Sequence, residues 1–94
     1  MRIEKADVVI PLNGRDAGKP FIIVATENDE YSFLADGKGR RIEKPKRKKN
    51  KHIKLLCKVE GHVAEKLTEG ERVTNNEIRR ALSEIVTHGE KGGM

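Results

Sequence analysis

Short apolar segments separated by strong turn signals recur about every ten residues through the first half of this 94-residue chain. This spacing predicts a series of short strands and is typical of a small antiparallel β-barrel. Phe21–Thr26 is the most apolar and β-branched segment, so we expect it to be covered on both faces. Pro11 has no amide hydrogen for a ladder, so its strand should lie at an edge or end there. The expected strands are residues 6–12, 21–26, 31–35, 40–44 and 53–56.

The last part of the chain has helical spacing. Thr74 and Glu77 match a capping box, in which a hydroxyl and a carboxylate each bond the other residue's free backbone amide. A helix this short is marginal on its own, so its apolar stripe should pack on the barrel or on a partner. The stripe consists of Ile78, Ala81, Leu82, Ile85 and Val86.

These patterns predict a mainly β chain with a C-terminal α-helix. The barrel should occupy residues 1–57, and the helix, packed on the barrel, residues 74–88. Residues 58–73 are interpreted as a linker with a possible short helix, which Gly70 would end.

The most basic stretch is Lys38–Lys54, which holds ten of the twenty Lys and Arg residues and one acid, Glu43. It carries +9 in a chain of net charge +5, so the remaining residues carry −4. Cations at this density repel one another unless solvent or a polyanion compensates them. Nucleic acid is the obvious polyanion, because each neutralised phosphate releases a counterion.

Two other interpretations of this stretch remain open. Runs of Lys and Arg also serve as nuclear localisation signals or as solvated linkers. Apolar segments flank the run on both sides, however, which favours cations mounted on a folded scaffold over a free tail.

The loop Gly14–Pro20 looks at first like a phosphate-binding P-loop. That motif needs four residues between its glycines, a Ser or Thr after the Lys, and a following helix. This loop has three residues, then Pro20, then a predicted strand, so we exclude nucleotide hydrolysis. The loop is a tight turn, and Arg15 and Lys19 could also contact a phosphate backbone.

Catalytic and metal-binding patterns are weak. Most acidic residues are predicted at turns or on the surface, and no Ser, His and Asp set suggests a nucleophile and its base. His52, Cys57 and His62 are five residues apart, unlike the closely spaced pairs of structural zinc sites. We therefore expect no enzymatic activity, metal, cofactor or small-molecule substrate, and interpret Cys57 as a small buried hydrophobe.

Tyr31 and Phe33 allow two interpretations. They could stack on bases, as aromatic residues of single-strand-binding sheets do. Large apolar side chains are scarce in this chain, however, which favours a place in the core. In that case the protein would contact phosphates and read shape more than bases.

The sequence gives no sign of membrane association. It has neither a signal-peptide pattern nor an eighteen-residue apolar stretch. Its single cysteine fits a reducing compartment. We expect a cytoplasmic protein.

Three consecutive pieces of the first half resemble a KOW motif, in which a strand, a glycine-containing loop and a second strand open a small SH3-like barrel. They are Asp7–Val9, Gly14–Lys19 and Phe21–Val24. The continuation is similar to bacterial KOW-domain RNA-binding proteins akin to eukaryotic-type large-subunit ribosomal proteins; it comprises Leu34–Gly37, Arg40–Lys46 and His52. Val73–Leu82 looks like the tail helix of such proteins, whereas we match no part of Cys57–Gly70 to them.

The resemblance implies binding to ribosomal or other structured RNA, with ribosomal proteins as possible neighbours, or a translation or transcription accessory role. Together with the basic run it predicts a non-enzymatic RNA-binding protein. The alternative is a protein-interaction module that docks through the C-terminal helix. The predicted RNA contacts are Arg15, Lys19, Arg40, Arg41, Lys44, Lys46, Arg47, Lys48, Lys49 and Lys51, with Gly14 and Gly18 shaping the loop.

Overall fold

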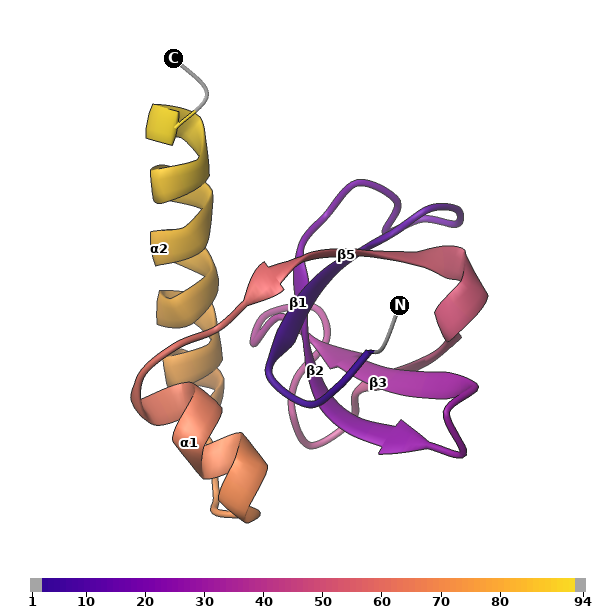
Figure 1. The fold of residues 1–94 in the computed structure, drawn as a ribbon, viewed down its shortest axis with the longest axis horizontal. Coiled ribbons are helices and arrows are strands. Elements are labelled where there is room, and N and C mark those ends of the chain that lie inside the picture. The colour runs from indigo at the N-terminus through magenta and orange to yellow at the C-terminus, as the bar shows by residue number, and fades with distance from the viewer. Residues whose placement is uncertain (1–2, 93–94) are drawn as a thin grey trace.

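The computed structural model describes residues 3–92, with side chains as far as Ile85. Five strands and a short 3-10 turn come first, and two helices follow (Figure 1). The elements are β1 (Asp7–Pro11), β2 (Phe21–Glu27), β3 (Tyr31–Ala35), β4 (Lys46–Lys49), η1 (Asn50–His52), β5 (Ile53–Lys58), α1 (His62–Glu69) and α2 (Asn75–Gly92).

The strands form one antiparallel sheet in the order β4-β3-β2-β1-β5. This confirms a mainly β chain. The sheet is strongly curled, and η1 links the two edge strands on the side away from the helices (Figure 1). Within residues 3–92 β4 and β5 do not pair, so the sheet is not closed.

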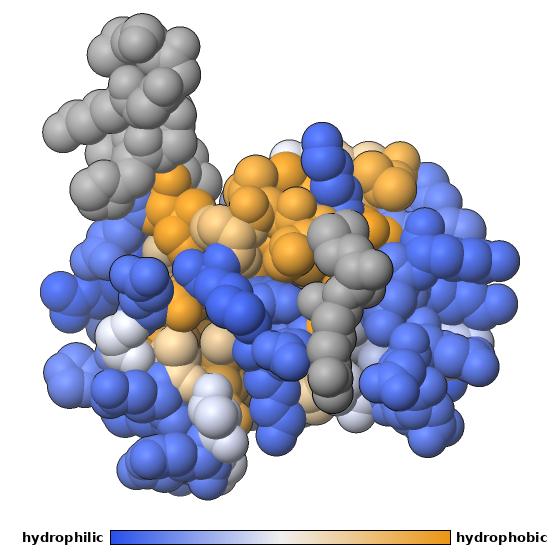
Figure 2. Space-filling model, viewed as in Figure 1, coloured by the Kyte–Doolittle hydropathy of each residue, from blue (hydrophilic) through white to orange (hydrophobic). Residues whose placement is uncertain are grey.

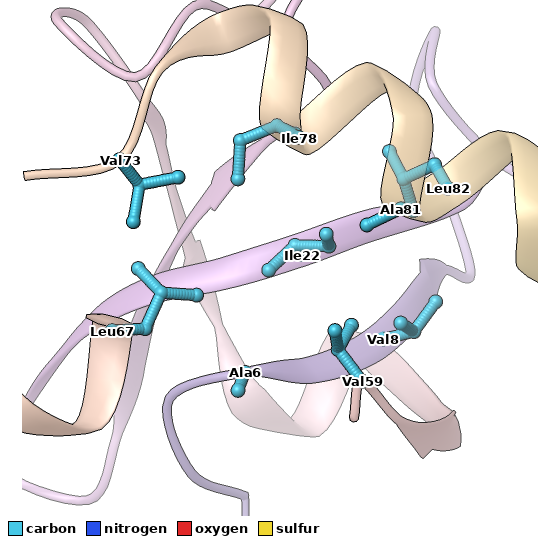
Figure 3. Packing of buried hydrophobic residues seen from close by; sticks show 9 residues of the cluster. All are labelled: Ala6, Val8, Ile22, Val59, Leu67, Val73, Ile78, Ala81 and Leu82. Atoms are coloured by element: carbon cyan, nitrogen blue, oxygen red, sulfur yellow. The ribbon is translucent and has the colours of Figure 1, made fainter. Parts of the chain in front are cut away.

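Apolar side chains pack against both faces of the sheet because alternate residues of a strand point to opposite sides. Phe21 and Ile23 of β2 point into the curl, where they are fully buried with Val9. Ile22 points the other way, toward the helices (Figure 3). The prediction that this segment is covered on both faces is confirmed. Pro11 is the last residue of β1, as its missing amide hydrogen requires.

The capping box at the start of α2 is confirmed. The backbone amide of Glu77 donates to Thr74 Oγ1 at 3.2 Å, and the amide of Thr74 donates to Glu77 Oε1 at 3.1 Å. From the predicted stripe, Ile78, Ala81 and Leu82 are buried against the sheet. The stripe's last residue, Val86, lies outside the described side chains. The helix passes the predicted end at residue 88 and reaches Gly92.

The predicted short helix is also confirmed, as α1. It ends at Gly70, whose backbone is left-handed with φ 78°. Residues 58–73 contribute Val59, Leu67 and Val73 to the core cluster that α2 shares with the sheet (Figure 3).

The strand expected at residues 40–44 is wrong, because those residues form a turn. The amide of Ile42 donates to Asn75 Oδ1 at 2.8 Å, and Asn75 Nδ2 donates to Glu43 at 2.8 Å. This turn is therefore bound to the start of α2 instead of to β3. The strand begins later, at Lys46, and consists entirely of basic residues.

Neither helix of the described residues is both long and apolar enough to cross a membrane.

Candidate nucleic-acid interface

Strand β4 divides the basic run into two groups of cations. Lys46 and Lys48 point to the inner side of the sheet and are half-buried, whereas Arg47 and Lys49 point outward and are exposed. The inner pair shares its face with two buried residues of β3, Ser32 and Leu34.

The inner cations contact the loop between β1 and β2. Lys48 Nζ donates to Asn13 Oδ1 at 2.8 Å and to the Asn13 backbone carbonyl at 3.3 Å. Lys46 Nζ lies 3.4 Å from Asp16 Oδ2. Two segments that the sequence places far apart, the loop 12–20 and the strand β4, therefore form one surface.

Gly14 and Gly18 give the loop its bend. Both have positive φ angles, 85° and 83°, which side chains rarely adopt. The bend exposes Arg15 and Lys19 beside the same surface.

Asp16 organises the cations around the loop. Besides its contact with Lys46, it forms an ion pair with Arg40, whose Nε lies 3.5 Å from Asp16 Oδ2. Partial burial acts to raise the pKa of Asp16, but the hydrogen bond and charge of Lys46, with Arg40 and Lys19, outweigh it and lower the pKa below its ordinary value. The carboxylate is thus charged at neutral pH and compensates part of the basic charge.

The expectation that Tyr31 and Phe33 belong to the core is wrong. Tyr31 and Phe33 are half-buried on the outer face, because Ser32 and Leu34 take the inner positions of β3. The inner space is filled by other residues, and Ser32 Oγ donates to Asn50 Oδ1 at 2.5 Å.

Arg47 lies on this outer face, with its guanidinium carbon 3.6 Å from the centroid of the Tyr31 ring. Its Nη2 is 2.8 Å from Glu27 Oε1. Lys49 Nζ lies 6.0 Å from the same ring centroid. The sequence interpretation missed Glu27 as a partner, because it took this acid for a surface residue of a turn.

The η1 turn fixes where the end of the basic run lies. The amide of Asn50 donates to the Glu30 carbonyl at 2.8 Å, and Asn50 Nδ2 donates to the Asp29 carbonyl at 3.0 Å. These bonds hold η1 against the turn between β2 and β3. Lys51 is exposed from this anchored turn.

The remaining predicted contacts, Arg41 and Lys44, are exposed in the turn that binds the start of α2. The structure thus distributes the predicted residues over the loop, both faces of β4, η1 and this turn. Arg40, Lys46 and Arg47 pair with the chain's own acids. Among the side chains described, those of residues 3–85, no ion pair occupies the others, which are Arg15, Lys19, Arg41, Lys44, Lys48, Lys49 and Lys51.

The buried acid Asp7 differs from the expectation of turn and surface acids. It lies in β1, is 1% exposed, and accepts bonds from Lys58 Nζ at 2.9 Å and from the Glu4 amide at 2.8 Å. Both carboxylate oxygens have partners, which gives Asp7 a structural role. Across the described residues, no three His, Cys, Asp or Glu side chains lie together as metal ligands.

A second surface feature is an apolar groove of about 480 Å³ between β5 and α2. Leu56, half exposed, lines it together with Cys57 and Ile85. Figure 2 shows apolar side chains gathered on this side of the molecule. Burial, and the nearby charge of Asp7, raise the pKa of the half-buried Cys57 thiol, so the thiol is protonated at neutral pH.

A scan against protein-family models finds no match for this chain, and a search of curated proteins finds no similar sequence.

Proposed function

We propose that this protein is a non-enzymatic RNA-binding protein that contacts the phosphate backbone through the loop 12–20 and the basic run from β4 to η1. The observation that carries the proposal is the pair of contacts from Lys48 to Asn13 and from Lys46 to Asp16. They join the glycine-containing loop and the basic strand into one positively charged surface.

The proposed fold type is the SH3-like barrel of KOW domains. The strand order supports it, since the two edge strands β4 and β5 follow each other in the chain and the three-residue η1 joins them. The curl encloses an apolar interior that includes Phe21, Leu34 and Ile53. The strands that flank the loop, β1 and β2, and the strand that pairs with β4, β3, all contribute side chains to this interior.

Binding would depend mainly on phosphate neutralisation. Cations without an acidic partner gain most from a phosphate, because they lose no existing ion pair when it arrives. Lys49 and Lys51 meet this condition among the described side chains, and both are exposed. Lys19 is exposed too and forms no ion pair there, although its charge acts on Asp16. Phosphate contacts carry no sequence information, so this part of the interface would bind many sequences alike.

Ribosomal RNA is the proposed ligand, on the basis of the resemblance to KOW-domain proteins, with a cytoplasmic location and ribosomal proteins as neighbours. Crosslinking in cells followed by sequencing of the attached RNA tests this. Enrichment of ribosomal RNA would support the assignment. Enrichment of other RNA would redirect it, and the absence of crosslinked RNA would overturn it.

The second candidate is a protein-interaction module that uses the C-terminal helix. Ile78, Ala81 and Leu82 are buried in the chain's own core, so this part of the stripe is not available to a partner. Only the apolar groove at Leu56 and Ile85 favours this function. Deleting residues 74–94 would expose the core, so replacing Leu56 by Gln is the sharper test: loss of a protein partner with RNA binding retained would favour the second candidate.

A further inference from the structure

Two rows of side chains cross the outer face of the sheet. Backbone pairing places Glu27 of β2, Tyr31 of β3 and Lys49 of β4 in one row. Phe33 and Arg47 are paired in the next. Directly paired residues of antiparallel strands point to the same side, so all five share one face.

Arg47 crosses from its own row to the neighbouring one. Its guanidinium lies over the Tyr31 ring, and a 3.6 Å distance to the ring centroid corresponds to face-to-face contact between two planar groups. Its Nε and Nη2 both lie 2.8 Å from Glu27 Oε1. The ring beneath the guanidinium and the carboxylate at its edge therefore fix the orientation of the plane.

This arrangement leaves the second face of the guanidinium toward solvent. The Arg47 side chain is 50% exposed, although one face rests on Tyr31. Glu27 already compensates its charge, so Arg47 is a poorer phosphate contact than Lys49, whose ammonium has no acidic partner within the described chain. What Arg47 presents outward is a flat, oriented, polarisable surface.

We propose that Arg47, held by Tyr31 and Glu27, stacks on an unpaired RNA base while Lys49 contacts the phosphate beside it. Bases stack on arginine planes as they do on aromatic rings, and such stacking tolerates any base. A base inside a duplex has no free face, so only an unpaired nucleotide can bind in this way. The inference rests on the proposed function and specifies its ligand as single-stranded RNA or an unpaired nucleotide of a structured RNA.

The test compares a single-stranded oligoribonucleotide containing 2-aminopurine with a duplex of the same length. Arg47→Lys keeps the charge and removes the plane. We expect it to weaken single-strand binding about tenfold, to abolish quenching of the 2-aminopurine fluorescence, and to leave duplex binding and the salt dependence unchanged. Tyr31→Phe, which keeps the ring, should behave like the unchanged protein, and Tyr31→Leu should behave like Arg47→Lys.

Arg80→Lys is the matched control, because it makes the same exchange at an exposed arginine that lies outside the loop and the basic run. It should retain both quenching and affinity. Single-strand binding by Arg47→Lys at the affinity of the unchanged protein would overturn the stacking role and leave the phosphate contacts standing. Equal weakening toward single strand and duplex would also overturn it. Failure of the unchanged protein to bind either RNA would overturn the proposed function as well. Thermal melting of each variant separates these outcomes from unfolding.

Discussion

Lys48 and Asn13 are 35 positions apart in the sequence, yet Lys48 Nζ donates a hydrogen bond of 2.8 Å to Asn13 Oδ1. Lys48 lies in the edge strand β4, and Asn13 lies in the loop between β1 and β2. The same ammonium lies beside Gly14, where an added Cβ would be 3.5 Å from it. This contact brings the two basic segments together, and the predictions about RNA binding depend on it.

Reversing three exposed cations should remove RNA binding without affecting the fold. Lys19, Lys49 and Lys51 form no ion pair among the side chains of residues 3–85, and the charge of Lys19 acts on Asp16 only at longer range, so changing all three to Glu breaks no ion pair. We expect a loss of affinity of at least about a hundredfold and an unchanged melting temperature. Fluorescence anisotropy with labelled RNA and a thermal melt measure the two effects.

The control for this experiment reverses the charge of three cations outside the proposed interface. Lys5, Arg72 and Arg80 are exposed and belong to neither the loop nor the basic run. Their triple change to Glu alters the net charge equally and should cost much less affinity. Equal losses in the two variants would show that net charge acts alone, without a defined surface.

Salt should weaken binding steeply. Each phosphate neutralised on a single strand contributes about −0.7 to the slope of log K against log salt concentration. About five contacts then give a slope of about −3.5, or roughly a hundredfold loss between 50 and 200 mM salt. Titrations at several salt concentrations measure the slope, and a flat dependence would contradict phosphate neutralisation.

Removing one acid should tighten binding. Asp16 pairs with Arg40 and Lys46, and its lowered pKa keeps it charged at neutral pH. Asp16→Asn keeps an oxygen that can accept the Lys46 hydrogen bond but frees both cations for phosphate. We expect affinity to rise about two- to fivefold, measured by the same anisotropy assay. A loss of affinity would mean instead that the carboxylate is needed to position Lys46.

Local sequence patterns predicted the elements that depend on neighbouring residues. The capping box of Thr74 and Glu77 lies within four consecutive residues, and the stop of α1 at Gly70 depends on one backbone angle. Strand β2 could also be predicted from its own residues. A segment that is apolar at successive positions is stable only when both of its faces are buried.

Long-range contacts explain what the sequence did not predict. Four cations in a row have no alternation, so β4 is defined only by its pairing with β3. The outward position of Tyr31 depends on which face of β3 meets an interior already filled by Phe21 and Ile23. The turn 40–44 was mistaken for a strand because its partner, Asn75, lies more than thirty positions away. In each case, contacts with residues distant in the sequence determine the local structure.

The capping box should make stability depend on pH. The hydrogen bond from Lys66, followed by the Thr74 amide, lowers the pKa of Glu77 from 4.5 to about 2. A carboxylate with a lowered folded-state pKa stabilises the fold fully above its unfolded value, and this contribution is lost as the pH falls from 4.5 toward about 2. Glu77→Gln should therefore melt at a lower temperature than the unchanged protein at pH 7, and the difference should disappear near pH 2. A difference that does not change with pH would contradict the assignment.

Gly37 should tolerate no side chain. Its φ angle is 78°, and an added Cβ would overlap with the backbone carbonyl oxygen of Asn75 and lie 2.8 Å from Arg79 Cγ. Arg79 Nη1 also donates to the Gly37 carbonyl at 2.6 Å. The hairpin formed by β3 and β4 therefore approaches α2 closely at Gly37. Because backbone strain and overlap add, Gly37→Ala should cost about 2–5 kcal/mol in the free energy of unfolding, measured by denaturant titration.

Two other glycines separate the causes of that loss. Gly18 has a similar φ angle of 83° but nothing within 4 Å of an added Cβ, so Gly18→Ala should cost only the strain, about 1–2 kcal/mol. Gly39 has neither constraint, and Gly39→Ala should be close to neutral. If Gly37→Ala costs no more than Gly18→Ala, the close approach of the hairpin to α2 does not exist in solution. The turn that carries Arg41 and Lys44 would then be held to α2 only through the bonds of Asn75 to Ile42 and Glu43.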